Sequence, residues 1–133
     1  MRKTQPTEPS YAPAFLGKAR QFLADADRAL ADSHYDSALL LSVHAAISAG
    51  DAITAALGRV RSTDPDHSRA VTLLREVAGR SVDVEDKARQ YAGLIGTKHT
   101  VEYESRRTRI DEAAGGVKRA ERLIGWASQI VKR

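Results

Sequence analysis

The sequence predicts a single all-α domain, and three observations lead to this fold class. Three of the four prolines lie within the first 13 residues and the fourth is Pro65, so most of the chain is free to be helical. Apolar residues recur at steps of three and four in several long segments, and no segment shows the alternation of a strand. At 133 residues, the chain has the length of one domain. We therefore expect an antiparallel helical bundle with four main helices and a short additional helix.

The first 13 residues predict a flexible tail, because Pro6, Pro9 and Pro13 alternate there with polar residues. The tail lacks the apolar stretch of a signal peptide. Residues 14–133 are expected to form the bundle domain.

The first helix is predicted over about residues 14–31, with Phe15, Phe22 and Leu30 on its apolar face. The second, over about residues 35–58, is rich in alanine on nearly every side. Several neighbours can approach such a helix closely, so we expect it at the centre of the bundle. His44 and Asp51 lie two turns apart on it, and we interpret them as satisfied polar groups at the edge of the core.

The third and fourth helices begin after recognisable start signals. Asp64 followed by Pro65 predicts a short helix over about residues 65–78. Asp83 predicts a fourth helix from about Val84 onward. Gly93 and Gly96 lie inside that helix, where each costs roughly 1 kcal/mol relative to alanine. Such a helix is expected either to kink or to pack its backbone closely against a neighbour.

A fifth helix is predicted from Thr108 almost to the end of the chain, with Asp111 as a variant of the capping box. Its apolar stripe is widened by Leu123, Trp126 and Ile130. Together with Gly93 and Gly96, this wide face predicts more packing surface than one bundle needs. We therefore expect a homodimer.

The amino-acid composition bears on disulfides, metal sites, membrane segments and the charge of possible partners. The chain has no cysteine, which excludes disulfides and thiolate metal sites and fits a cytoplasmic protein. No apolar run is expected to approach the length of a membrane span. A net charge of +4 and a pI near 9.6 permit an acidic partner, but equally describe an ordinary soluble surface. The excess of arginine over lysine and the absence of asparagine indicate a GC-rich bacterial genome, such as that of an actinobacterium.

Familiar catalytic motifs are absent from the sequence. It contains no glycine-rich phosphate loop, no GxGxxG and no HExxH. Its four histidines lie far apart along the chain, so we expect neither a metal nor a cofactor.

The segment of residues 94–109 is the best candidate for a functional site, because an apolar helical stripe runs there into ionisable residues. On a helix, Lys98 and Glu102 are neighbours, which is typical of a surface ion pair. Alternatively, Lys98, His99 and Tyr103 could meet a phosphate and are then the catalytic candidates. The candidate ligand-binding residues are Lys98, His99, Glu102, Tyr103, Arg106, Arg107 and Arg109.

The helix layout and the short motif Lys98-His-Thr-Val-Glu-Tyr103 resemble the HEPN domain family. In many HEPN proteins the corresponding helix ends in Arg-x-x-Ala-Asp-Tyr. The resemblance covers nearly all of the chain after Pro13. It implies a stand-alone bundle of four main helices that forms a homodimer.

Catalytic HEPN proteins are metal-independent RNases with an arginine, four to six intervening residues and then a histidine. The resemblance places Lys98 at the arginine and Glu102 or Tyr103 near the histidine, so the catalytic pair is degenerate. The spacing recurs between Arg28 and His34 and between Arg61 and His67. We interpret both matches as chance, away from the motif region.

Three hypotheses remain open. The first is a non-catalytic module that binds nucleic acid, a nucleotide or a protein partner as a homodimer. The second is an endoribonuclease of a toxin-antitoxin system, held by a nucleotidyltransferase-type antitoxin as in related HEPN systems. The third is a scaffolding bundle without a ligand.

Overall fold

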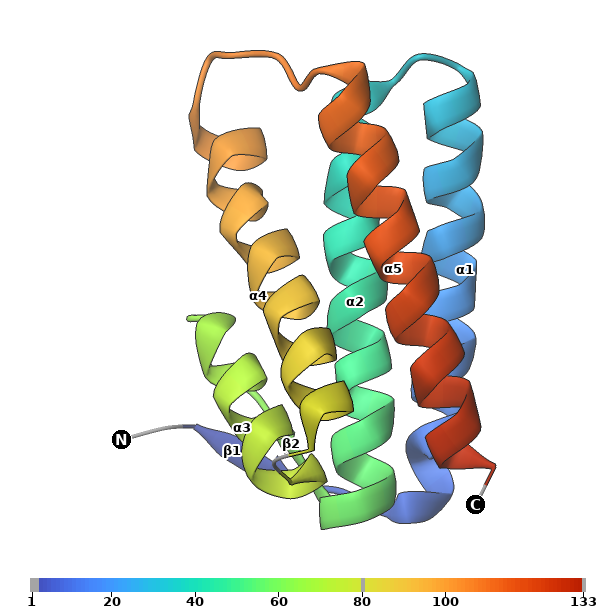
Figure 1. Cartoon of the computed structure of the whole chain (residues 1–133), viewed down its shortest axis with the longest axis vertical. Helices are drawn as coiled ribbons and strands as arrows, with labels where there is room; N and C mark the ends of the chain where they lie inside the picture. Colours follow the sequence, from blue (N-terminus) through green and yellow to red (C-terminus); the bar gives the residue numbers. More distant parts are fainter. Residues whose placement is uncertain (1–2, 80, 133) are drawn as a thin grey trace.

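Four long helices form the bundle, and a shorter helix packs against its lower half (Figure 1). The structure is a computed structural model that describes residues 3–79 and 81–132. The predicted fold class, an all-α helical bundle, is confirmed. The helices are α1 (Ala12–Ala31), α2 (Tyr35–Gly58), α3 (Ser68–Ala78), α4 (Val82–Tyr103) and α5 (Ile110–Val131).

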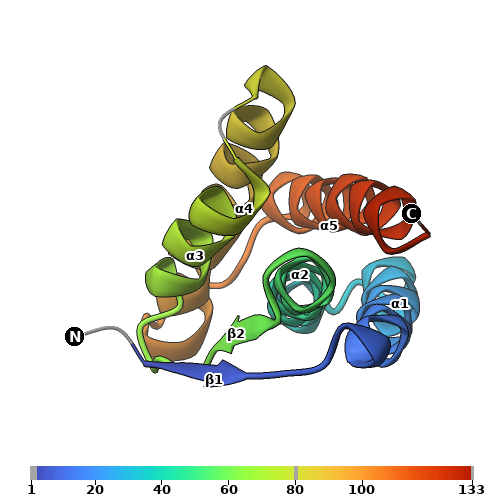
Figure 2. The same cartoon turned by 90° about the horizontal axis from the view of Figure 1, so that it is seen from below.

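The alanine-rich helix α2 lies at the centre, with α1, α5 and the α3–α4 pair around it (Figure 2). Most of its residues from Ala38 to Ala55 are buried, including Val43 and Ile53 at 0% and 1% exposure. By length and composition alone α2 could cross a membrane, so the expectation that no apolar run reaches that length was wrong. In the bundle, 78% of this apolar window is buried, as in the core helix of a soluble protein.

Three glycines let helices approach α2 more closely than any side chain would permit. A Cβ on Gly58, at the end of α2, would lie 2.8 Å from both Cγ atoms of Val77 on α3. A Cβ on Gly50 of α2 would lie 2.9 Å from Cε2 of Tyr91 on α4, and a Cβ on Gly116 of α5 would lie 2.6 Å from Cδ1 of Leu39. The glycines singled out in the sequence behave differently. A Cβ on Gly93 would meet only the side chain of Arg119, and one on Gly96 would meet no atom within 4 Å.

A small antiparallel ribbon joins the start of the chain to the segment after α2. Strand β1 (Thr4–Pro6) pairs with β2 (Val60–Ser62), with Thr4 opposite Ser62 and Pro6 opposite Val60. A 3-10 turn (Pro9–Tyr11) leads directly into α1. Of the predicted tail, residues 4–6 thus pair as a strand, residues 9–11 form the turn and residues 12 and 13 belong to α1, while residues 1 and 2 lie outside the described residues. Three-residue strands are too short to show alternation, so the sequence carried no signal for them.

The predicted starts of three helices require correction. Helix α3 begins at Ser68, because the Asp64 and Asp66 carboxylates accept hydrogen bonds from the backbone N–H groups of Asp66 and Ser68 and so hold residues 64–67 in turns.

Helix α4 begins at Val82, where Ser81 and not Asp83 is the cap: its hydroxyl accepts a hydrogen bond from the backbone of Val84 at 3.2 Å. In α5, Glu112 and not Asp111 completes the cap, since its carboxylate accepts a hydrogen bond from the backbone of Arg109 at 3.0 Å.

His44 and Asp51, the polar residues singled out in α2, contact different neighbours. Asp51 is 6% exposed and pairs with Arg61, whose Nη2 lies 3.2 Å from Oδ2. Burial raises the pKa of Asp51 to about 6 in spite of this cation. The ring of His44 instead packs against Phe22 of α1, with a centroid distance of 5.8 Å.

We predict opposite effects for one substitution at two glycines. Gly50→Ala should lower the free energy of unfolding by about 1–3 kcal/mol, because the rigid ring of Tyr91 cannot yield in a filled core. Gly96→Ala meets no neighbour and should raise it by about 0.5–1 kcal/mol through helix propensity. Urea denaturation of both variants measures the difference, and equal effects would contradict the close packing of α2 against α4.

Candidate functional site

The candidate site surrounds the end of α4 and the loop of residues 104–109, and a carboxylate of α2 fixes this loop. The Asp36 carboxylate accepts a hydrogen bond from the backbone of Thr108 at 2.9 Å and another from Nε of Arg107 at 2.7 Å. Hydrogen bonds from Thr108, reinforced by the Arg107 guanidinium, lower the pKa of Asp36. Since Asp36 lies in the first turn of α2, the loop is tied to an element 71 residues earlier in the chain.

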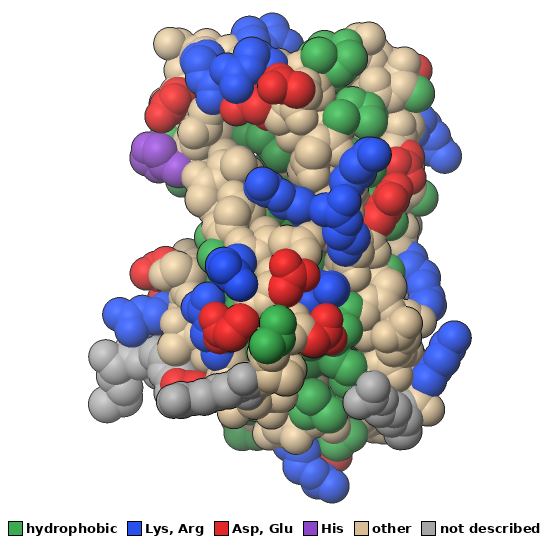
Figure 3. Space-filling view, viewed as in Figure 1, with side chains coloured by type: hydrophobic (Ala, Val, Ile, Leu, Met, Phe, Trp, Pro, Cys, Tyr) green, Lys and Arg blue, Asp and Glu red, His purple; other side chains and the backbone are tan. Residues whose placement is uncertain are grey.

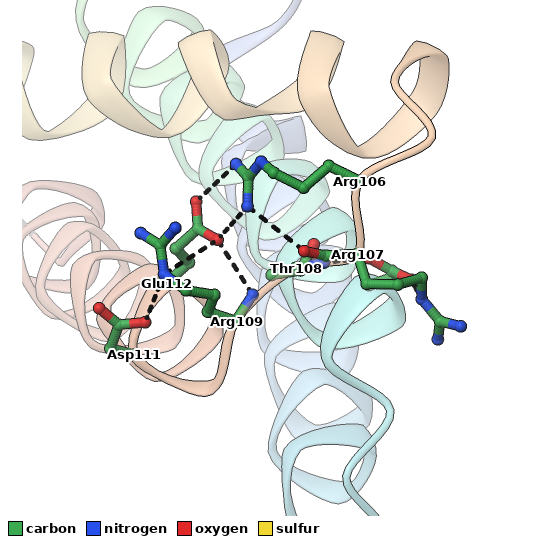
Figure 4. Close-up of polar contacts among 7 residues, drawn as sticks. Arg106, Arg107, Thr108, Arg109, Asp111 and Glu112 are labelled. Atoms are coloured by element: carbon green, nitrogen blue, oxygen red, sulfur yellow. Dashed lines mark hydrogen bonds and ion pairs between the residues drawn. The ribbon is translucent and has the colours of Figure 1, made fainter.

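A second carboxylate holds the loop from the α5 side (Figure 4). The Arg106 guanidinium binds Glu112 through two hydrogen bonds, at 2.8 and 3.0 Å. These bonds, with that from the backbone of Arg109, lower the pKa of Glu112 to about 2. The Arg109 side chain itself lies 3.3 Å from Asp111.

Lys98 and Glu102 form the surface ion pair that their helical spacing predicts. Nζ and Oε2 are 2.8 Å apart, and the lysine lowers the pKa of the glutamate. All four cations of the candidate site are thus matched within the chain by carboxylates. A phosphate would have to compete with these carboxylates for each cation.

His99 and Tyr103 form a separate contact on the outside of α4. Their rings lie 5.2 Å apart at 42°, and Tyr103 is 73% exposed. Successive residues on a helix point about 100° apart, so His99 does not share the direction of Lys98. Among the described residues, no hydrogen bond joins Lys98 to His99. In this structure Lys98 thus binds Glu102, while His99 contacts Tyr103, and their meeting at one phosphate stays a prediction.

Two other histidines, from different elements, lie within electrostatic reach of Lys98. His44 comes from α2, and His67 is the residue before α3; both are half-buried. Partial burial lowers the pKa of each histidine, and the nearby charge of Lys98 lowers it further, while Glu102 opposes the shift. We call His44, His67, Lys98 and Glu102 the two-histidine cluster.

His67 lies nearer to the motif region than its place in the sequence suggests, since the charge of Lys98 acts on its pKa. Its sequence neighbours are turn residues, and only the return of the chain along α4 brings it near Lys98. Its spacing partner Arg61 is engaged elsewhere, with Asp51 and over the ring of Phe15 at 5.1 Å. Within the described residues, no group of three His, Asp or Glu side chains could hold a metal ion.

The arrangement of helices and the motif at the end of α4 define the class of protein as a HEPN-like bundle. A comparison with protein-family models agrees: the model described as HEPN domain matches residues 12–131. The chain therefore belongs to the HEPN domain family.

Among solved structures, the chain is similar to one described as the crystal structure of TT1696 from Thermus thermophilus. The TM-score is 0.71 and the identity 22%, over 90% of this chain and 98% of that one. At this identity, the likeness supports the fold alone. No curated protein matches the chain.

We predict that Glu112→Gln loosens the loop, because it removes one carboxylate that holds Arg106 and caps α5. The thermal midpoint should fall by roughly 3–6 °C at pH 7. The pKa of Glu112 is lowered on folding from 4.5, so its stabilisation is present above pH 4.5 and is lost as the pH falls toward 2. The gap between variant and wild type in thermal melts should close over that window.

Glu121→Gln, at an exposed position of the same helix, is the control and should change little. A loop effect of Glu112→Gln that persists unchanged at pH 2 would contradict the assignment.

Proposed function

We propose that this HEPN-family protein is a non-catalytic module that binds a protein partner, and that the partner is a second copy of the chain. The observation that carries the proposal is the internal pairing of every cation at the candidate site. Nucleic-acid binding draws its affinity from cations that neutralise phosphates. Cations already matched by carboxylates contribute little to such binding.

Exposed apolar and aromatic side chains remain at the same end of the molecule. Tyr103 is 73% exposed and Ile110 is 60% exposed, on either side of the fixed loop, with His99 beside Tyr103. Tyrosine and arginine are enriched at the centres of protein interfaces. Arginines that are held in place lose little freedom on binding, so this end of the bundle suits a protein partner.

The family's catalytic positions support a non-catalytic role. Lys98 stands where catalytic HEPN proteins carry arginine, and its ammonium is held by Glu102 at 2.8 Å. Lysine cannot reproduce the bidentate grip of arginine on a phosphate. Glu102 and Tyr103 stand near the position of the family's histidine, and neither replaces its role as an acid and base near neutral pH.

The surface proposed for self-association differs from the one expected on sequence grounds. Leu123, Trp126 and Ile130, which widen the face of α5, are at most 9% exposed because they pack inside the bundle. They offer no dimer surface. The exposed residues Tyr103 and Ile110 take their place in the proposal.

We predict that the protein sediments as a dimer at micromolar concentration and that Tyr103→Glu weakens the dimer at least about 30-fold, the effect of removing a hot-spot side chain. Tyr11→Glu is the matched control, since Tyr11 is 55% exposed at the opposite end of the bundle. Sedimentation velocity over a concentration series gives both values. A monomer at all concentrations, or an equal effect of Tyr11→Glu, would refute the proposal.

The two-histidine cluster favours a second candidate, a metal-independent endoribonuclease. Cleavage of RNA without a metal needs a base for the 2′-hydroxyl proton, an acid for the leaving 5′-oxygen and a cation for the phosphate. Two histidines and a lysine can divide these roles, and lowered pKa values favour neutral, basic imidazoles near pH 7. A nucleotidyltransferase-type antitoxin would then be the expected partner.

Incubation with total RNA in EDTA separates the two candidates. The non-catalytic proposal predicts no cleavage by the wild type. The opposite result would overturn that proposal: the wild type cleaves RNA, and His44→Gln and His67→Gln each reduce the cleavage rate at least about 100-fold, as expected for a general acid or base. His99→Gln would retain the cleavage in that case. Correct folding of the variants is checked by circular dichroism.

A further inference from the structure

A pocket of about 180 Å³ opens between α4 and α5, beside the first turns of α2. Its floor is apolar and includes the buried side chains of Leu39 and Leu94. Gly116 packs directly on this floor, since a Cβ there would lie 2.6 Å from Leu39 and 3.4 Å from Leu94. Gly115 forms part of the wall, and a Cβ on it would meet no atom within 4 Å. The open space of the pocket therefore lies beside Gly115.

The pocket is visible from the side on which α4 and α5 face the viewer. Figure 3 shows green side chains at the bottom of a hollow, between a charged group above and blue side chains over α5 below. Arg119 of α5 is one of the residues that line it. Its Nη1 lies 3.1 Å from the position of a Cβ on Gly93, so the guanidinium reaches across to α4 at the edge of the pocket.

Arg119 is the cation of this pocket that lacks a carboxylate. Among the residues that the structure describes, Arg119 makes no hydrogen bond or ion pair. The two acidic residues of the pocket wall are already engaged, Glu112 by Arg106 at 2.8 Å and Asp111 by Arg109 at 3.3 Å. The electrostatic preference of the pocket is therefore for an anion, next to an apolar floor.

We propose that this pocket binds a small organic anion, a carboxylate or a phosphate monoester with a compact apolar body. The anionic group would bind the Arg119 guanidinium, which is suited to two-pronged contact with either group. The apolar body would rest on Leu39 and Leu94. The volume equals that of about six waters, and an apolar cavity of about 150 Å³ is known to hold benzene, so one six-membered ring fits. The pocket borders the proposed dimer surface, because Asp111 and Glu112 of its wall bind Arg109 and Arg106, but the proposal does not depend on self-association.

Nuclear magnetic resonance titration of the ¹⁵N-labelled full chain tests the ligand class. Benzoate and phenyl phosphate are the anionic probes, and benzyl alcohol and benzylamine are the neutral and cationic comparators. The anions should shift the amides of Thr97, Gly115 and Gly116 and bind about ten-fold tighter than benzyl alcohol, as expected for a charge-assisted contact. The tighter of the two anions identifies the preferred group.

Benzylamine binding as tightly as the anions would overturn the proposal. So would shifts scattered over the surface, or no binding of any probe.

Two substitutions test the residues, each with a matched control on the same helix. Arg119→Gln should weaken benzoate about ten-fold, and Gly115→Leu should abolish binding by filling the space. Arg122→Gln and Gly125→Leu make the same chemical changes at exposed positions outside this pocket and should leave affinity unchanged. If Gly115→Leu lowers the thermal midpoint of the protein, the test rests on Arg119→Gln alone. An unchanged benzoate affinity in Arg119→Gln would refute the site.

Discussion

The close packing of every other helix on α2 is the constraint on which the rest of this structure depends. It requires a helix whose surface is small on all sides, and alanine, glycine and serine provide it. Where even alanine is too large, glycine takes the position, as Gly50 does beneath Tyr91 and Gly116 does above Leu39. The separation of α4 from α5, the pocket between them and the direction of His44 all follow from the order in which these helices surround α2.

At the C-terminal end of α4, carboxylates of the same chain neutralise the basic side chains. Asp36, Glu102, Asp111 and Glu112 come from three helices and each holds one of the basic residues that the sequence places together. A run of arginines in a sequence therefore need not produce a basic surface. The charge of such a surface depends on how many carboxylates the fold brings next to the arginines. This neutralisation favours a protein partner over RNA at that end of the bundle.

The sequence predicted the helical elements well because their apolar periodicity is long and regular; the range of α2 agrees at both ends. It failed at helix starts, where one hydroxyl or carboxylate decides the first residue, as at Ser81 and Glu112. The Lys98–Glu102 pair was predictable from its spacing on one helix. The approach of His67 to Lys98 was not, because it depends on how α3 docks, and no local pattern encodes that position.

The contact of Asp36 with the loop after α4 has a consequence for how the molecule assembles. Neighbouring helices such as α1 and α2 can meet early, because only a short turn separates them. The loop, in contrast, is held by a residue 71 positions away, and such a contact stabilises only after the entropy of closing the intervening chain has been lost. The end of α4 that carries the family motif therefore takes its final shape late in folding. Opening of that end costs less than unfolding of the core and leaves α1 and α2 in place.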